Sequence, residues 1–195
     1  MVRTAFWSCA SRSPGALMEI GVLRGGTFRG LVDCGRAKGV KVHAVDSFAG
    51  MGVPGKMDGE CYPKGKFNIG GQGAFRRIMR NKGYSDKEYM VWEGYVPAIL
   101  KQMPTDLALG FIRVDLDHYQ PTLDAGIWAW ERLLPNGYLT FHDFMPNRNT
   151  PKLASAAVLE LMWGVLKDAK LLVVEEKEAI FQKAALGEVE NEPGC

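Results

Sequence analysis

The sequence predicts an α/β protein with a mostly parallel sheet, helices on both of its faces and an antiparallel hairpin at the C-terminal end. Apolar runs typical of strands alternate with segments typical of helices, and this alternation is characteristic of parallel sheets. The last two apolar runs, residues 171–176 and 179–183, are joined only by a tight turn around Lys177, which predicts the hairpin. Right-handed crossovers then place helices on both faces.

The composition predicts one globular domain with a small-molecule partner. The chain has 195 residues, of which 47% are hydrophobic and 24% charged, with a net charge of +2 at pH 7. We expect a single domain at residues 1–186 and a flexible tail at 187–195. The near-balanced net charge does not indicate a nucleic-acid partner. Without a membrane-length or signal-peptide run, or paired CxxC cysteines, we expect a cytoplasmic protein that has no membrane partner, zinc site or disulfide framework.

Residues 17–30, LMEIGVLRGGTFRG, predict the first strand and a ligand-binding loop. Glycines after a strand let the backbone approach a ligand, and the N–H groups that open the next helix face it. Gly21 and Gly25 are too far apart for the G-x-G-x-x-G fingerprint, which argues against a nicotinamide-dependent oxidoreductase. Glu19 would repel a pyrophosphate but attract an ammonium group.

The next unit predicts a helix at 27–38 that ends at Gly39, and a strand at 40–48. Asp46 lies near the C-terminal end of that strand, where a carboxylate can accept hydrogen bonds from both hydroxyls of a ribose. The alternative is that Asp46 caps a turn. The glycine- and lysine-rich segment 49–73 is either a lid or a mobile insertion. Because it leaves directly from the second strand, we favour the lid.

The rest of the chain continues the alternation. Strands are expected at 89–92, 107–115 and 138–144, and helices at 74–82, 95–103, 121–134 and 151–167. Asn136 and Gly137 are expected to stop the third of these helices. The helical tryptophans Trp128, Trp130 and Trp163 are expected in the core.

Acidic and histidine residues follow several strands, so they should meet at one edge of the sheet. Carboxylates packed together repel one another, and a cationic ligand or a divalent ion would relieve that repulsion. Asp115 and Asp143 offer oxygen ligands for Mg²⁺, whereas His142 would shift the preference toward manganese, iron or zinc, or point away. Each residue also has a structural alternative, as a turn cap, a loop polar group or a hydrogen-bonded histidine. The set comprises Glu19, Asp46, Asp115, Asp117, His118, His142 and Asp143.

Five sequence blocks occur in one order across residues 16–145: MEIGVLRGGT, VDSFAGM, EGYVPAIL, VDLDHYQPTLDA and LLPNGYLTFHDF. Together they resemble the macrocin O-methyltransferase family of class I S-adenosylmethionine (SAM)-dependent methyltransferases. The resemblance implies a Rossmann-like, seven-stranded fold that binds SAM. It also implies methyl transfer to a hydroxyl of a small molecule, such as a sugar of a natural product, assisted by a divalent metal.

The resemblance implies roles for individual residues. The cofactor-binding set is Glu19, Gly21, Gly25, Thr27, Asp46, Ser47, Phe48, Glu93, Gly94 and Asp115. In it, Glu19 and Gly21 lie by the methionine end, Asp46 holds the ribose, Ser47 and Phe48 border the adenosine, and Glu93 and Gly94 lie near the adenine. Asp115 and Asp143 would hold Mg²⁺. His142 stands where many relatives have an aspartate, so Mn²⁺ or another divalent ion is an alternative.

The catalytic base is expected at Asp117 or His118, and we favour His118 because imidazole titrates near neutral pH. Relatives commonly carry extra helices before the first strand. Here the acceptor would be covered by the 49–73 segment, by a second subunit of a homo-oligomer, or not at all. A catalytically degenerate SAM-binding module is an alternative function, against which the acids at the sheet edge argue.

Overall fold

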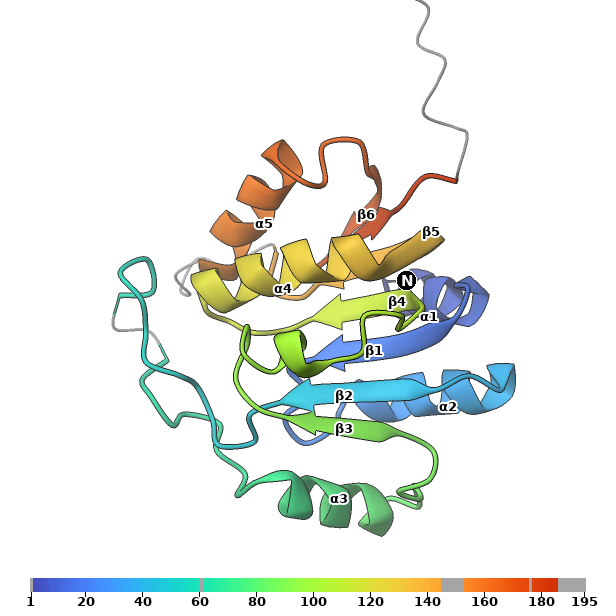
Figure 1. Ribbon diagram of the computed structural model, residues 1–195, viewed down its shortest axis with the longest axis vertical. Helices are drawn as coiled ribbons and strands as arrows, with labels where there is room; N and C mark the ends of the chain where they lie inside the picture. The colour runs from blue at the N-terminus through green and yellow to red at the C-terminus, as the bar shows by residue number, and fades with distance from the viewer. Residues whose placement is uncertain (1, 60–61, 145–152, 176, 186–195) are drawn as a thin grey trace, which may run out of the picture.

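The described residues form one seven-stranded sheet in the order β3-β2-β1-β4-β5-β7-β6 (Figure 1). The computed structural model describes residues 2–59, 62–144, 153–175 and 177–185. Strands β1 to β5 pair in parallel, and β7 runs antiparallel to both β5 and β6. The predicted mostly parallel, Rossmann-like sheet with a C-terminal hairpin is therefore confirmed. The strands are β1 (Ala16–Ile20), β2 (Val42–Asp46), β3 (Met90–Glu93), β4 (Leu109–Val114), β5 (Leu133–Phe141), β6 (Lys170–Glu175) and β7 (Glu178–Gln182).

Helices cover both faces because successive strand residues point to opposite sides of the sheet. In β1, Leu17 packs in a cluster with Phe6 and Phe28, whereas Met18 belongs to a second cluster with Trp128. The first cluster lies under α1 (Val2–Arg12), α2 (Phe28–Lys38) and α3 (Gln72–Asn81). The second lies under α4 (Tyr119–Arg132), α5 (Leu153–Trp163) and the 3₁₀ helix η1 (Leu100–Gln102).

Several predicted element ends are confirmed and others are wrong. Gly39 closes α2 in the left-handed conformation, at φ 67°, as predicted. Helix α4 ends at Arg132, and Asn136 and Gly137 lie inside β5 rather than at a helix stop. Residues 95–103 form turns and η1 rather than a regular helix. Met103, which precedes Pro104, is extended at ψ 148°, because a residue before proline is disfavoured in the helical conformation.

The tryptophans follow the prediction only in part. Trp128 is buried and Trp130 packs against the core, but Trp163 is 88% exposed. Helix α5 is apolar around most of its circumference, so its sequence pattern does not select one buried face. Within the described part of the chain, no helix is long and apolar enough to cross a membrane. The predicted tail at 187–195 lies outside the described residues.

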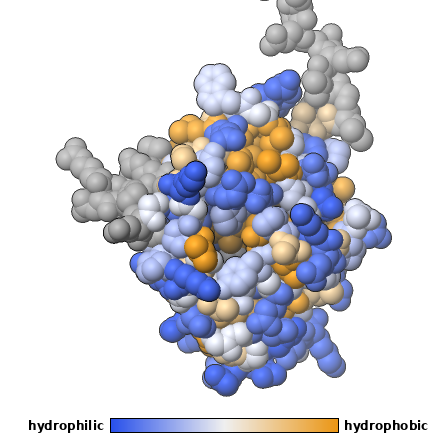
Figure 2. All heavy atoms as spheres, turned by 60° about the vertical axis from the view of Figure 1, so that its left-hand side comes forward, coloured by the Kyte–Doolittle hydropathy of each residue, from blue (hydrophilic) through white to orange (hydrophobic). Residues whose placement is uncertain are grey.

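The fold brings the carboxyl ends of the parallel strands to one edge, at the left of Figure 1. The segment 49–73 leaves β2 at that edge and extends beside it. Figure 2 turns this edge toward the viewer and shows apolar and hydrophilic surface mixed across it.

Candidate active site

A cavity of about 520 Å³ lies at the carboxyl edge of the sheet. Its size is within the range of small-molecule sites. The ends of β1, β2 and β4 and the residues after β3 form its floor and sides. The cavity brings together seven of the predicted site residues: Gly21, Asp46, Ser47, Gly94, Asp115, Asp117 and His118.

The segment 49–73 walls this cavity, as expected for a lid. Met51, Val53 and Phe67 supply apolar lining from the segment. Asp58, which is buried, fixes the segment to the start of α4: its Oδ1 accepts a 2.8 Å hydrogen bond from the backbone N–H of Tyr119. Its Oδ2 accepts another, of 2.8 Å, from the N–H of Gly55. The lid is therefore docked by a buried carboxylate at a helix N-terminus, a favourable place for negative charge.

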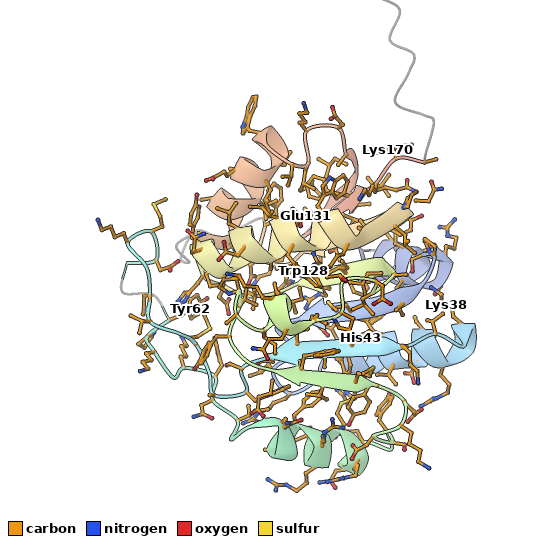
Figure 3. The ribbon with its side chains drawn as sticks, in the orientation of Figure 1. Lys38, His43, Tyr62, Trp128, Glu131 and Lys170 are labelled. Carbon is orange, nitrogen blue, oxygen red and sulfur yellow. The ribbon has the colours of Figure 1, made fainter. Side chains whose placement is uncertain are left out.

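His118 makes the second contact between the lid and α4. Its Nε2 lies 3.1 Å from the carbonyl oxygen of Tyr62, which lies at the carboxyl edge of the sheet (Figure 3). A carbonyl oxygen only accepts hydrogen bonds, so Nε2 carries the proton in this contact. The His118 side chain lines the cavity but is only 2% exposed.

Asp46 holds the loop after β1. Its Oδ2 accepts 2.9 Å hydrogen bonds from the N–H groups of Val22 and Leu23, and its Oδ1 accepts one of 2.7 Å from Phe48. A carboxylate has about four acceptor positions, so these bonds leave about one for a ligand hydroxyl. The predicted hydrogen bonds from both ribose hydroxyls would therefore compete with these backbone N–H groups for the Asp46 carboxylate.

Gly21 lets the ends of β1 and β4 approach closely. Its φ is 89°, and a Cβ atom there would overlap the carbonyl oxygen of Asp115. Only glycine combines that conformation with that contact at low cost. The close approach keeps Asp115 at the same cavity wall as Gly21.

Beneath the edge, a buried ionic row crosses the sheet. Arg113 of β4 donates a 2.6 Å hydrogen bond from Nη1 to Oε1 of Glu19, and the same nitrogen lies 2.7 Å from Oδ2 of Asp115. Its Nη2 donates a 2.9 Å bond to Oε1 of Glu178 in β7. Burial raises the pKa of Glu19 to about 7, because the cost of desolvating its carboxylate exceeds the opposing effect of the Arg113 charge.

Three predicted metal ligands are also brought together. Asp115, His142 and Asp143 each offer a ligand atom, and these atoms lie within 4.8 Å of one another. Carboxylate oxygens with one imidazole nitrogen suit a divalent cation, so this donor set fits the metal that the resemblance implies. Lys177 already neutralises part of the charge, with Nζ 3.1 Å from Oδ1 of Asp143.

Asp117 borders both the cavity and this cluster, since its side chain hydrogen-bonds that of Asp143. It lines the cavity and is half-buried, with a left-handed φ of 58°. Burial, followed by the charges of Asp115 and Asp143, raises the pKa of Asp117 to about 7.

Five predicted cofactor residues do not line the cavity. Gly25 packs against Met79 and Phe75, and Thr27 precedes α2 without a side-chain cap. Phe48 is in the core, where it stacks on Phe75 with ring centroids 4.9 Å apart, so its side chain is not free to border a ligand.

The other two are acids with protein partners. Glu93 is exposed and accepts a 3.1 Å hydrogen bond from the N–H of Gln72, at the start of α3. Glu19 is 2% exposed and bonded to Arg113, although its Oε2 has no hydrogen-bond partner among the described residues. The contact of Glu19 with a ligand ammonium group stays a prediction. Among the described residues Oε2 has no partner, so it is the oxygen available for that contact.

Sequence reasoning missed Arg113, Glu178 and Asp58. A charged residue in the middle of a buried, apolar strand was the available signal for Arg113, because such residues need partners when buried. Glu178 and Asp58 carried no comparable signal, since their partners are distant in the sequence.

A family model described as a methyltransferase domain matches residues 18–144, from β1 to just beyond β5. The chain belongs to this family. The prediction of a SAM-dependent methyltransferase is thereby confirmed, and the matched region includes every residue that lines the cavity.

Solved structures of methyltransferases share this fold. The O-methyltransferase NovP is 22% identical with a TM-score of 0.78, over 93% of this chain and 78% of that chain. CalS11, a calicheamicin methyltransferase, is 18% identical with a TM-score of 0.70, over 93% of this chain and 77% of that one. The SAH-bound methyltransferase PaMTH1 of Podospora anserina is 15% identical with a TM-score of 0.60, over 91% and 75%. No curated protein sequence matches this methyltransferase.

Proposed function

We propose that this methyltransferase transfers the methyl group of SAM to a hydroxyl of a small molecule, as the resemblance to the macrocin O-methyltransferase family implies. One observation carries the proposal: a single cavity joins Gly21, Asp46 and Gly94 to Asp115, Asp117 and His118. The first group would hold the methyl donor and the second the acceptor. NovP is described as an O-methyltransferase, and CalS11 as a TDP-rhamnose 3′-O-methyltransferase, which supports a sugar hydroxyl as the acceptor.

The chain's own residues would bind and orient the two substrates. SAM supplies an electrophilic methyl group on a sulfonium sulfur. Asp46 offers about one free acceptor position to the donor, and Gly94 gives it room beside the end of β3. The lid residues Met51, Val53 and Phe67 would exclude water from the reacting atoms.

Asp117 and His118 remain the two candidates for the base. The sequence favoured His118, whereas the geometry supports Asp117. Nε2 of His118 donates to Tyr62, and the ring is almost fully buried, so this side chain fixes the lid. Asp117 is half-buried on the cavity wall, where its carboxylate would accept the proton of the acceptor hydroxyl.

Asp115, Asp143 and His142 would hold a divalent ion, Mg²⁺ or Mn²⁺, beside Asp117. The ion would lower the pKa of the acceptor hydroxyl. We further propose that residues 1–186 form one catalytic domain and that the acceptor is a small molecule rather than a nucleic acid. If the 49–73 segment does not cover the acceptor, a second subunit of a homo-oligomer would do so.

Calorimetric titration of SAM into the protein tests the proposal. The informative variant is Gly52→Leu: Gly52 lines the cavity, and a Cβ there would lie 3.8 Å from the Tyr95 ring, in ordinary contact. A leucine would then fill the cavity without overlapping the backbone. The matched control is Gly73→Leu in α3, where a Cβ meets nothing within 4 Å.

We expect the wild type and the Gly73→Leu variant to bind SAM alike, and the Gly52→Leu variant to bind it much more weakly. A panel of sugars, phenols and catechols, with detection of the methylated product, then identifies the acceptor class. Failure of the wild type to bind SAM would exclude the proposed function. Equal binding by all three proteins would place SAM elsewhere.

A further inference from the structure

Glu178 contacts the one imidazole of the proposed metal cluster. Its Oε1 lies 2.9 Å from Nδ1 of His142. The other imidazole nitrogen, Nε2, lies 3.6 Å from Oδ1 of Asp143. A carboxylate is an acceptor, so in this contact Nδ1 carries the proton and donates it, and the lone pair belongs to Nε2. The lone pair therefore faces Asp143, one of the two aspartates of the cluster.

Glu178 is itself rigidly held. Its Oε1 accepts hydrogen bonds from Arg113 at Nε, 3.2 Å, and Nη2, 2.9 Å. Its Oε2 accepts a 2.7 Å bond from Oγ1 of Thr140. The side chain of Glu178 is only 13% exposed, so few other orientations are available to it. The imidazole of His142 is thus hydrogen-bonded to a carboxylate whose own position is set by several hydrogen bonds.

The sheet register builds this arrangement. Arg113 in β4 lies opposite Thr140 in β5, and Thr140 lies opposite Ile180 in β7. Since alternate residues share a face, Glu178 and His142 follow on the same side of the sheet as Arg113. A histidine two residues after Thr140 therefore reaches the cluster from the same face as its carboxylate partner.

The charges at this edge leave room for a cation. Among the described residues, five acidic side chains gather here and two permanent cations contact them: Arg113 contacts three of the acids, and Lys177 contacts one. The acids are Glu19, Asp115, Asp117, Asp143 and Glu178. Lys177 is half-exposed, so it can move into solvent when an ion binds to Asp143.

We propose that Glu178 is a positioning residue that makes His142 a nitrogen ligand through Nε2, and that the site consequently favours Mn²⁺ over Mg²⁺ more strongly than an all-carboxylate site would. The proposal rests on the proposed function, because it concerns the metal of that site. A hydrogen-bonded carboxylate behind a histidine fixes the ring and increases its basicity as a ligand. Imidazole suits transition ions, whereas Mg²⁺ prefers oxygen.

The test is direct metal binding. Mn²⁺ and Mg²⁺ are titrated calorimetrically into the full-length protein without acceptor, and pulsed electron paramagnetic resonance of the Mn²⁺ complex detects coupling to an imidazole nitrogen. The variants are His142→Asp, which restores an all-oxygen set, and Glu178→Gln, which keeps an acceptor for Nδ1 but removes the charge. His43→Asn, in the buried histidine of β2, is the matched control.

We expect imidazole coupling in the wild type and in the His43→Asn variant, and none in the His142→Asp variant, whose Mn²⁺-to-Mg²⁺ affinity ratio should fall. Glu178→Gln should weaken Mn²⁺ binding by about 10–100-fold. An unchanged ratio in the His142→Asp variant, coupling that persists in it, or no metal binding by the wild type would overturn the inference. SAM binding measured on the same samples separates these results from a failure of the proposed function.

Discussion

Glu19 and Arg113 lie directly opposite each other on the paired strands β1 and β4, and their side chains meet at 2.6 Å in the interior of the sheet. Arg113 also compensates Glu178 in β7 and Asp115, which follows β4, so one guanidinium contacts three carboxylates. A buried charge is costly unless it is paired and hydrogen-bonded. The stability of the carboxyl edge therefore depends strongly on this buried cation.

The first prediction concerns removal of that cation. Arg113→Met should lower the free energy of unfolding by about 3–5 kcal/mol, because it leaves buried carboxylates uncompensated. The control is Arg36→Met, whose ion pairs with Asp33 and Glu88 lie at the surface, where solvent screens them, so its loss of stability should be much smaller. Urea unfolding measures both, and equal losses would contradict the importance of the buried row.

The second prediction concerns pH. His43 lies within the sheet (Figure 3), where Trp92 donates a 3.1 Å hydrogen bond to its Nδ1. Burial, with a smaller effect of Lys41, lowers its pKa from 6.5 to about 4. The unfolded chain then binds more protons than the folded one between these values, so stability falls as the pH falls from about 6.5 to 4.

The full effect of this shift is about 3 kcal/mol. The variant His43→Asn keeps an acceptor for Trp92 but does not titrate in this range. Its unfolding free energy, measured by urea at several pH values, should decline less than that of the wild type across the window. Parallel curves for the two proteins would show that His43 is not the group responsible.

The third prediction concerns the lid. Asp58→Ala removes the carboxylate that joins the 49–73 segment to the N-terminus of α4, so amides around 50–58 should exchange hydrogen faster. Mass spectrometry of deuterated peptides measures this. The exposed Asp106→Ala variant is the control and should leave the exchange of these peptides unchanged. Unchanged exchange in the Asp58→Ala variant would mean that other contacts dock the lid.

The fourth prediction separates the two candidate bases. Asp117→Asn should lower kcat by about 10²–10⁴-fold while SAM affinity is retained, because the amide cannot accept the proton. His118→Gln keeps an N–H for the Tyr62 carbonyl and should retain most of kcat. Initial rates at saturating substrates measure both variants. The reverse order of losses would assign the base to His118.

The local features of the fold could be predicted from the sequence, but the contacts between distant strands could not. The Gly39 helix end and the rim position of Asp46 could be predicted because a short pattern determines each one. The partnership of Arg113 with Glu19 spans 94 residues, and no local pattern identifies it.

Tertiary context also overrode some local signals. Asn136 and Gly137 are typical of a helix stop, yet both lie in β5. The N–H of Asn136 donates a 3.0 Å hydrogen bond to the carbonyl of Lys183, just beyond β7, and the N–H of Lys183 donates one of 3.0 Å to the carbonyl of Gly137. Phe48 lies two residues after Asp46, but its side chain is buried in the core, where it stacks on Phe75. A strand-end motif thus indicates a region of the site more reliably than it indicates each side chain's contact.

The docking of the lid on α4 has a consequence for the order of events in turnover. Two contacts between the segment and α4, Asp58 to the Tyr119 N–H and His118 to the Tyr62 carbonyl, both involve residues within two positions of Asp117. A movement of the segment away from α4 would break both contacts together, so the start of α4 would lose its cap and His118 its partner. Entry of substrate and assembly of the catalytic geometry would then be a single step.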